Sequence, residues 1–273
     1  MSYAALLVYL EADGIPEERV HLAATLADRF GARLIGLSAL GVRPPVVADG
    51  MVMVDVTQID IELVRKALVE KGDWFDKIAS SDHRKLEWRS ALDFPTDVLA
   101  REARSADLVI IGQRRGPGGV YRSLNPGEAI LKMGRPTLIV PDGVSSLRGE
   151  HVVIGWKDTR EARSAMRDAL PFLKDAIDVT IVESCSPEEE KNAIERVNDV
   201  AGYLKGHQIN SVGRVVAQEN RSHAEPLMRI AREQDADLLV TGAYGHSRLG
   251  EWIFGGVTRQ LLSISPICCL MSH

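Results

Sequence analysis

The sequence predicts an α/β fold of two tandem, doubly wound domains, each with a mostly parallel five-stranded sheet. First, short apolar and β-branched runs alternate with helical patterns along the chain, which is typical of parallel strands covered by helices. Second, "ADLVIIG" at 106–112 recurs as "ADLLVTG" at 236–242, and the same offset of 130 positions places "RPTLIVP" onto "SPICCLM". Third, 273 residues can form two domains of ordinary size.

The repeat sets the expected domain boundaries. We expect a first domain at residues 1–143 and a second at 150–273, because the polar, turn-rich stretch "PDGVSSLRG" at 141–149 separates the copies. The copies differ most in their middles. Residues 41–60 have no equivalent in the second copy, and we expect an inserted loop there.

The elements follow in order. In the first copy, "ALLVYL" reads as a strand and "EERVHLAATLADRF" has the spacing of a core-facing helix. In the second copy, continuous apolar runs suit strands covered on both faces, and Asp158-Thr159 is a favourable helix start. There we expect strands near 152–156, 178–182, 212–217, 237–241 and 266–271, and helices near 160–173, 188–205, 222–234 and 256–263.

Composition excludes several classes of function. Lys and Arg number 33 against 38 Asp and Glu, so the net charge of -5 argues against a nucleic-acid partner. No run approaches the roughly 20 apolar residues of a membrane span, and we expect a soluble, cytoplasmic protein. The three cysteines suggest neither a disulfide framework nor a zinc site, and Cys268 and Cys269 read as part of a buried strand. No catalytic residue and no metal ligand can be named from motif spacing.

One glycine-rich stretch is a candidate phosphate site. "TGAYGHSRLGEWIFGGVTRQLL", residues 241–262, joins an apolar run to an amphipathic helix. Glycines let the backbone approach a ligand closely, and the first residues of a helix offer free N–H groups to an anion. The stretch is neither a Walker A loop nor a GxGxxG fingerprint. On this pattern alone, a turn without a ligand fits equally well.

The spacing of Gly242, Gly245 and Gly255 resembles the G-x2-G-x9-G-[S/T] nucleotide motif of the universal stress protein family, over nearly the whole chain as two copies. Some members bind ATP, and members often dimerise through their last strands. The resemblance implies that Gly242 lies near a ribose, and that Gly245, Gly255, Gly256 and Val257 hold phosphates. It also implies an intrachain pseudo-dimer, with "RPTLIVP" meeting "SPICCLM", and leaves a further homodimer open.

Two departures from that motif concern the ligand. Gly256 stands at the Ser/Thr position, so one hydroxyl is lost unless Thr258 replaces it. Lys157 stands where the family usually has an Asp that meets adenine, and Asp158 follows one residue later. A shift of one residue reverses the direction of a side chain at a strand end. Lys157 could face an anion, or Lys157 and Asp158 could only cap the helix at 160–173.

The first copy carries a degenerate motif. At the offset of 130, Gly112 is retained, but Arg115, Asn125 and Pro126 replace Gly245, Gly255 and Gly256. Pro126 has no N–H to donate, and Glu128 adds negative charge to the first helical turn. Asn125 as N-cap, Pro126 at N1 and Glu128 at N3 form a self-sufficient helix start. We therefore expect no ATP at this loop.

The sequence thus indicates a tandem universal stress protein that binds an adenine nucleotide or another small phosphate ligand in its second domain during a stress response. ATP is a candidate cofactor; no metal is expected from the sequence, and Mg²⁺ only as the counter-ion of ATP. Two alternatives stay open: an interaction module that binds no nucleotide, and a slow ATPase. A non-nucleotide small molecule also fits, because a fold does not fix its ligand.

Overall fold

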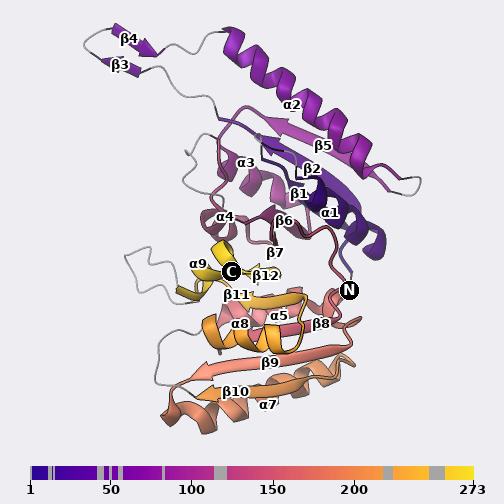
Figure 1. Ribbon diagram of the computed structural model, residues 1–273, viewed down its shortest axis with the longest axis vertical. Helices are drawn as coiled ribbons and strands as arrows, with labels where there is room; N and C mark the ends of the chain where they lie inside the picture. The colour runs from indigo at the N-terminus through magenta and orange to yellow at the C-terminus, as the bar shows by residue number, and fades with distance from the viewer. Residues whose placement is uncertain are drawn as a thin grey trace.

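The computed structural model of the chain describes residues 2–11, 14, 16–41, 46–48, 51–54, 58–81, 84–113, 122–217, 224–245 and 256–273. Figure 1 shows two α/β halves whose strands join at the middle of the molecule. The strands form one ten-stranded sheet in the order β10-β9-β8-β11-β12-β7-β6-β1-β2-β5, and a separate sheet pairs β3 with β4. The predicted α/β fold class is confirmed, with the two sheets continuous rather than separate.

The first half alternates strands and helices up to β7. Its elements are β1 (Ala5–Tyr9), α1 (Glu17–Phe30), β2 (Arg33–Ala39), β3 (Val46–Ala48), β4 (Met51–Val54), α2 (Gln58–Ala79), β5 (Leu86–Ala91), α3 (Pro95–Glu102), the 3₁₀ turn η1 (Ala103–Ser105), β6 (Leu108–Gly112), α4 (Pro126–Met133) and β7 (Thr137–Val140).

The second half repeats this order without the β3–β4 pair. Its elements are β8 (His151–Trp156), α5 (Arg160–Asp168), α6 (Leu170–Leu173), β9 (Asp178–Cys185), the 3₁₀ turn η2 (Pro187–Glu189), α7 (Glu190–Gly206), β10 (Val212–Ala217), α8 (Ala224–Glu233), β11 (Leu238–Gly242), α9 (Gly256–Ile264) and β12 (Cys268–Ser272).

Two expectations about these elements need correction. The helix expected at 160–173 is divided into α5 and α6 at Ala169, two residues before Pro171, which has no N–H to continue the helix. The insertion at 41–60, expected to be a loop, contains the antiparallel β3–β4 pair and the start of α2. Its Val- and Met-rich runs flank Asp49-Gly50, a dipeptide that favours hairpins.

Each half has a point where the strand order reverses. In the second half β8 lies between β9 and β11, with parallel pairing on both sides. In the first half β1 lies between β2 and β6 in the same way. Ligands of doubly wound sheets bind beyond the carboxyl ends of the strands at such a point.

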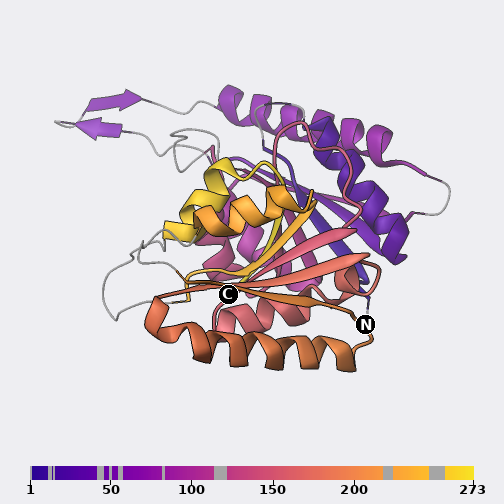
Figure 2. The same ribbon diagram turned by 60° about the horizontal axis from the view of Figure 1, so that its bottom comes forward.

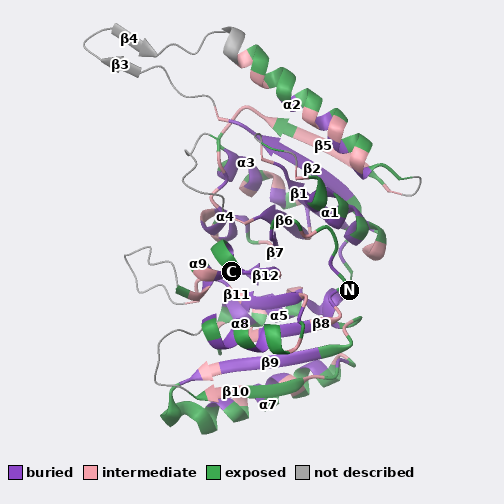
Figure 3. Ribbon diagram, viewed as in Figure 1, coloured by how far each residue is buried: buried purple, intermediate pink, exposed green. Residues whose placement is uncertain are grey.

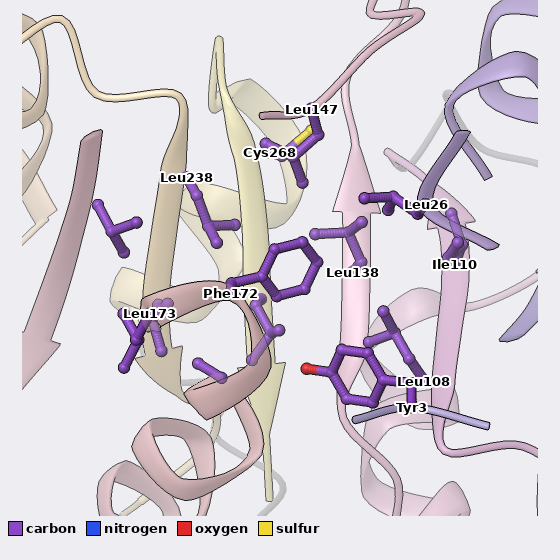
Figure 4. Packing of buried hydrophobic residues seen from close by; sticks show 14 of the residues in the cluster. Tyr3, Leu26, Leu108, Ile110, Leu138, Leu147, Phe172, Leu173, Leu238 and Cys268 are labelled. Atoms are coloured by element: carbon purple, nitrogen blue, oxygen red, sulfur yellow. The ribbon is translucent and has the colours of Figure 1, made fainter. Parts of the chain in front are cut away.

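The halves meet through their last strands. β12 and β7 pair antiparallel, with Leu270 opposite Leu138, and all other pairings described in the large sheet are parallel. On one face of the sheet, the rings of Tyr3, Phe30 and Phe172 pack together, with edge-to-face contacts of Phe30 to each of the other two. Figure 4 shows Phe172 between the strands of the two halves, near Tyr3 and Leu138.

The apolar core forms one layer on each face of the sheet. Residues of α1, α2, α5, α6 and α7 pack on one face, and residues of α3, α4, α8 and α9 pack on the other. The views in Figures 1 and 2 show these helices on both sides of the strands. In Figure 3 the central strands are buried, while α7 and much of α2 expose their outer faces. Continuous apolar strands are the expected result of cover on both faces.

The repeated Ala-Asp dipeptide has a structural role in both copies. The Asp107 carboxylate accepts hydrogen bonds from the N–H groups of Ala4 and Ala5, at 2.8 and 3.0 Å. Asp237 accepts from Gly149 at 2.7 Å, and also from the next two residues. Each aspartate therefore satisfies backbone donors where the first strand of its own half begins.

Candidate functional site

A pocket of about 260 Å³ lies at the reversal point of the second half. The carboxyl ends of three neighbouring strands supply one wall, where Trp156, Ser184 and Thr241 stand in the last two residues of β8, β9 and β11. Gly155, Val182 and Leu227 give the pocket an apolar side. The pocket is therefore mainly apolar, with a few polar groups at one end, as is usual for small-molecule sites.

The N-terminus of α9 opens into this pocket. Gly256, Val257 and Thr258, the first three residues of the helix, all line it. The first N–H groups of a helix have no partner within the helix and carry partial positive charge, which favours an anion. The Thr258 hydroxyl is buried and accepts a hydrogen bond from the Tyr244 N–H at 3.4 Å, so it also ties the preceding turn to α9.

Gly242 and Gly245 line the pocket as well, and neighbouring atoms exclude a side chain at Gly242 and leave little room for one at Gly245. A Cβ on Gly242 would lie 2.6 Å from the Ala162 backbone nitrogen, so this glycine lets α5 approach the end of β11. A Cβ on Gly245 would lie 3.1 Å from the Thr159 hydroxyl oxygen. The glycine spacing therefore serves helix packing as well as access to the pocket.

Lys157 and Asp158, the two residues that follow β8, have different surroundings. Lys157 is exposed at the pocket and has no hydrogen-bond or ion-pair partner for its ammonium group among the residues described. Asp158 does not line the pocket, and its carboxylate pairs with Arg163 at 2.9 Å on the surface of α5. The cap of α5 is Thr159, whose hydroxyl accepts from the Ala162 N–H at 3.3 Å.

A carboxylate lies beside the glycine turn. Glu161 is 8 % exposed, and its Oε2 would be 3.2 Å from a Cβ on Gly245. Burial opposes ionisation of this carboxyl, but hydrogen bonds from its own backbone N–H and from Thr159 favour it. The charges of Arg160 and His273 add to these bonds, and the net effect lowers the pKa of Glu161. Glu161 therefore stays ionised at the start of α5.

Sequence reasoning found the polar end of the pocket and missed the apolar end. Of the site residues named from the sequence, Lys157, Gly242, Gly245, Gly256, Val257 and Thr258 line it together, Asp158 does not, and Gly255 falls outside the described residues. Gly155, Ser184 and Leu227 were not foreseen. The available signal was Gly155, because a glycine inside a strand often marks a close approach of another group.

The loop of the first half has the predicted helix start. Asn125 is the N-cap of α4, its side-chain oxygen accepts from the Glu128 N–H at 3.3 Å, and Pro126 begins the helix. Arg115 falls outside the described part of the chain. The donor that Pro126 lacks is the one that Gly256 offers in α9.

Other features of the described residues bear on the class of protein. No group of three or more His, Cys, Asp or Glu side chains is placed there to hold a metal ion. No helix within those ranges is long and apolar enough to cross a membrane. Cys268 and Cys269 are buried in β12 as free thiols, as their apolar surroundings in the sequence predict.

Comparison with known proteins gives a family match for the second half and a shared fold for the whole chain. Residues 149–273 match the model of the universal stress protein family. A universal stress protein from Archaeoglobus fulgidus DSM 4304 aligns with 98% of this chain and 97% of its own, at 14% identity and a TM-score of 0.76. A functionally unknown protein from Pseudomonas aeruginosa PAO1 aligns with 99% of this chain and 92% of its own, at 12% identity and a TM-score of 0.57.

A shorter match covers about half of the chain. A universal stress protein from Archaeoglobus fulgidus, in complex with dAMP, aligns with 51% of this chain and 98% of its own, at 22% identity and a TM-score of 0.34. No curated protein matches the chain. Residues 149–273 therefore match the universal stress protein family, and the chain as a whole shares the fold of a universal stress protein.

Proposed function

We propose that the protein is a stress-response ligand-binding protein of two domains, 1–143 and 150–273, and that the second binds an adenine nucleotide such as ATP, or another small phosphate ligand. One observation carries the proposal. The N-terminus of α9 and the Lys157 side chain border the same pocket, at the strand ends where doubly wound sheets bind ligands.

The shape and charge of the pocket support this ligand class. Val182 and Leu227 border a space suited to a flat apolar ring, while α9 and Lys157 bring positive charge to the same pocket. A nucleotide has both parts, a ring and a phosphate chain. The volume of about 260 Å³ suits a ring with its sugar, and leaves the phosphates at the helix N-terminus.

Calorimetric titration of the purified protein with ATP tests the proposal. Before titration, the protein is denatured once to identify any nucleotide it carries, and the remaining sample is stripped. We expect about one ATP per chain. Lys157→Gln should weaken binding by roughly tenfold, since a hydrogen bond to a charged group contributes about 1.5–3 kcal/mol.

A matched control separates the pocket from general surface charge. Arg163→Gln removes a cation that pairs with Asp158 on the surface of α5 and should leave ATP affinity unchanged. Absence of bound nucleotide, together with no heat at millimolar ATP, would reject the nucleotide site and favour the interaction module. Slow release of phosphate from the bound ATP would instead indicate the slow ATPase.

A further inference from the structure

The strand registers make Tyr9 the first-half counterpart of Gly155. Tyr9 pairs with Leu37 across β1 and β2, as Gly155 pairs with Val182 across β8 and β9. The preceding residues agree, because Val8 pairs with Ile110 as Ile154 pairs with Val240. These β6 and β11 partners stand at the same position of the sequence repeat. One position of the sheet therefore carries a tyrosine in one half and a glycine in the other.

The Tyr9 side chain lies inside the first half. It is fully buried in the core layer on the face that α3 and α4 cover, and its hydroxyl donates to the Ala39 carbonyl at 3.3 Å. Burial raises the pKa of Tyr9 above its usual value, which keeps the hydroxyl protonated as a donor. In the second half Gly155 lacks a side chain on the equivalent face, and the pocket lies beside it.

Arg19 closes the adjoining part of the first half. Its guanidinium touches the place where a Cβ on Gly112 would be, and Gly112 is the repeat counterpart of Gly242. The Arg19 Nη1 donates to the Tyr9 carbonyl at 3.0 Å and to the Glu11 carboxylate at 2.7 Å. Its side chain is only 5% exposed, so this charge is paired and withdrawn from solvent.

A third side chain holds the segment that follows β1. The Lys71 ammonium, from α2, donates to the Gly14 carbonyl at 2.8 Å and also to the Glu11 carbonyl. Lys71 of α2 and the buried Arg19 of α1 therefore both hold the segment that starts at Tyr9. Counted two residues on from the Tyr9/Gly155 position, the counterpart of Glu11 is Lys157, which borders the open pocket.

We propose that the first half is a closed copy of the ligand site, in which the Tyr9 ring is a built-in occupant and Arg19 holds the Tyr9 backbone carbonyl. The proposal rests on the proposed function for the identity of the ligand in the open copy. The new claim is that each chain has one open and one filled ligand site. The residue at the Tyr9/Gly155 position determines which of the two sites is open. The filled place fits a single aromatic ring with a hydrogen-bond donor.

A reciprocal exchange tests the proposal. Gly155→Tyr should close the second-half pocket and weaken ATP binding by at least about tenfold, because a bulky ring replaces ligand volume. Gly155→Ala is the size comparison and should weaken ATP binding much less than Gly155→Tyr, because it adds one methyl group in place of a ring. The nearest atoms to its Cβ would be the two terminal methyl carbons of Leu227, at 2.8 and 3.3 Å, which a side-chain rotation can move, and the Thr241 hydroxyl, at 3.5 Å. Unchanged ATP affinity in a folded Gly155→Tyr protein would overturn the proposal.

The opposite substitution uses a probe that does not depend on ATP. Tyr9→Gly should lower the melting temperature, and 4-methylphenol, the free form of the missing side chain, should restore part of it. Toluene should restore less, since it cannot donate to the Ala39 carbonyl. Phe75→Ala, which removes another fully buried ring of the first half, should show no preference for 4-methylphenol over toluene.

The outcomes distinguish this proposal from the proposed function. If neither the wild type nor the variants bind ATP, the proposed nucleotide site is rejected. The rescue by 4-methylphenol then tests by itself whether Tyr9 fills a site that a small ligand can occupy. If Tyr9→Gly does not fold, Tyr9→Leu provides the smaller cavity for the same two probes. Equal rescue of the Tyr9 variant by toluene and 4-methylphenol would reduce Tyr9 to an ordinary core residue and reject the proposal.

Discussion

Gly256 lines the pocket and stands at the Ser/Thr position of the universal stress protein motif that the sequence resembles. A Cβ on Gly256 would meet nothing within 4 Å, so the position tolerates a side chain. We predict that Gly256→Ser tightens ATP binding by roughly tenfold, because a hydroxyl in the first turn of α9 can donate to a phosphate. Calorimetry measures the change, and Gly256→Ala controls for the loss of glycine. Equal affinities of the Ser and Ala variants would show that no phosphate reaches this position.

Glu161 should make the second half sensitive to acid. A lowered pKa in the folded protein means that ionised Glu161 stabilises the fold at any pH above its unfolded value, which is about 4.5. That contribution is lost as pH falls from this value through the lower, folded pKa. We predict that Glu161→Gln is less stable than wild type at pH 7 and that the difference shrinks by pH 3. Urea unfolding at the two pH values measures it.

The control for Glu161→Gln is the same substitution at an exposed glutamate. Glu18→Gln removes an exposed carboxylate from the first turn of α1, so its free energy of unfolding should follow that of wild type at both pH values. A Glu161→Gln difference that stays constant from pH 7 to pH 3 would contradict the role assigned to the ionised carboxylate.

Single elements were predictable where local chemistry determines them. The strand expected at 212–217 is β10 with the same bounds. The last strand, expected from 266, begins at Cys268, after Pro266, which cannot donate to a neighbouring strand. The division between α5 and α6 was missed, although Pro171 signals it, because the apolar spacing continues across the break.

The pocket shows a different limit of sequence reasoning. Its polar end could be named in advance because Gly242 to Thr258 lie close together in the chain. Its apolar end combines Gly155, Val182 and Leu227 from three elements, and only the strand order brings these together. A periodic pattern identifies an element, whereas the neighbours of that element depend on the sheet topology.

The aspartates that follow the repeated alanine should stabilise their strands to different degrees. Asp237→Ala leaves three backbone N–H groups at the start of β8 without their acceptor, and Asp107→Ala leaves two at β1. With solvent replacing part of the loss, we predict a destabilisation of about 2–3 kcal/mol for Asp237→Ala and less for Asp107→Ala. Urea unfolding compares the two, and the reverse order would show that the count of donors does not set the effect.

At the scale of the whole molecule, the two halves share more than a linker. The β7–β12 pairing continues the sheet across the middle, and the aromatic rings of Tyr3, Phe30 and Phe172 lie on one face of that junction. Arg29 pairs with Asp175 of the other half at 3.0 Å and packs over two of these rings. On the opposite face, α4 contacts α9, the helix that opens into the pocket.

This junction should make the halves unfold together. We predict a single calorimetric transition for the wild type, because separating the halves would expose the backbone of two central strands and a buried aromatic cluster. Phe172→Ala should cost about 3–5 kcal/mol and divide the transition in two, since it removes the second-half ring that packs on Tyr3 and Phe30 of the first half. Phe75→Ala removes a buried ring of the first half away from the junction, so it should lower the melting temperature while leaving one transition. Two transitions in the wild type would show that the continuous sheet does not couple the halves, and ligand binding in the second half would then leave the stability of the first unchanged.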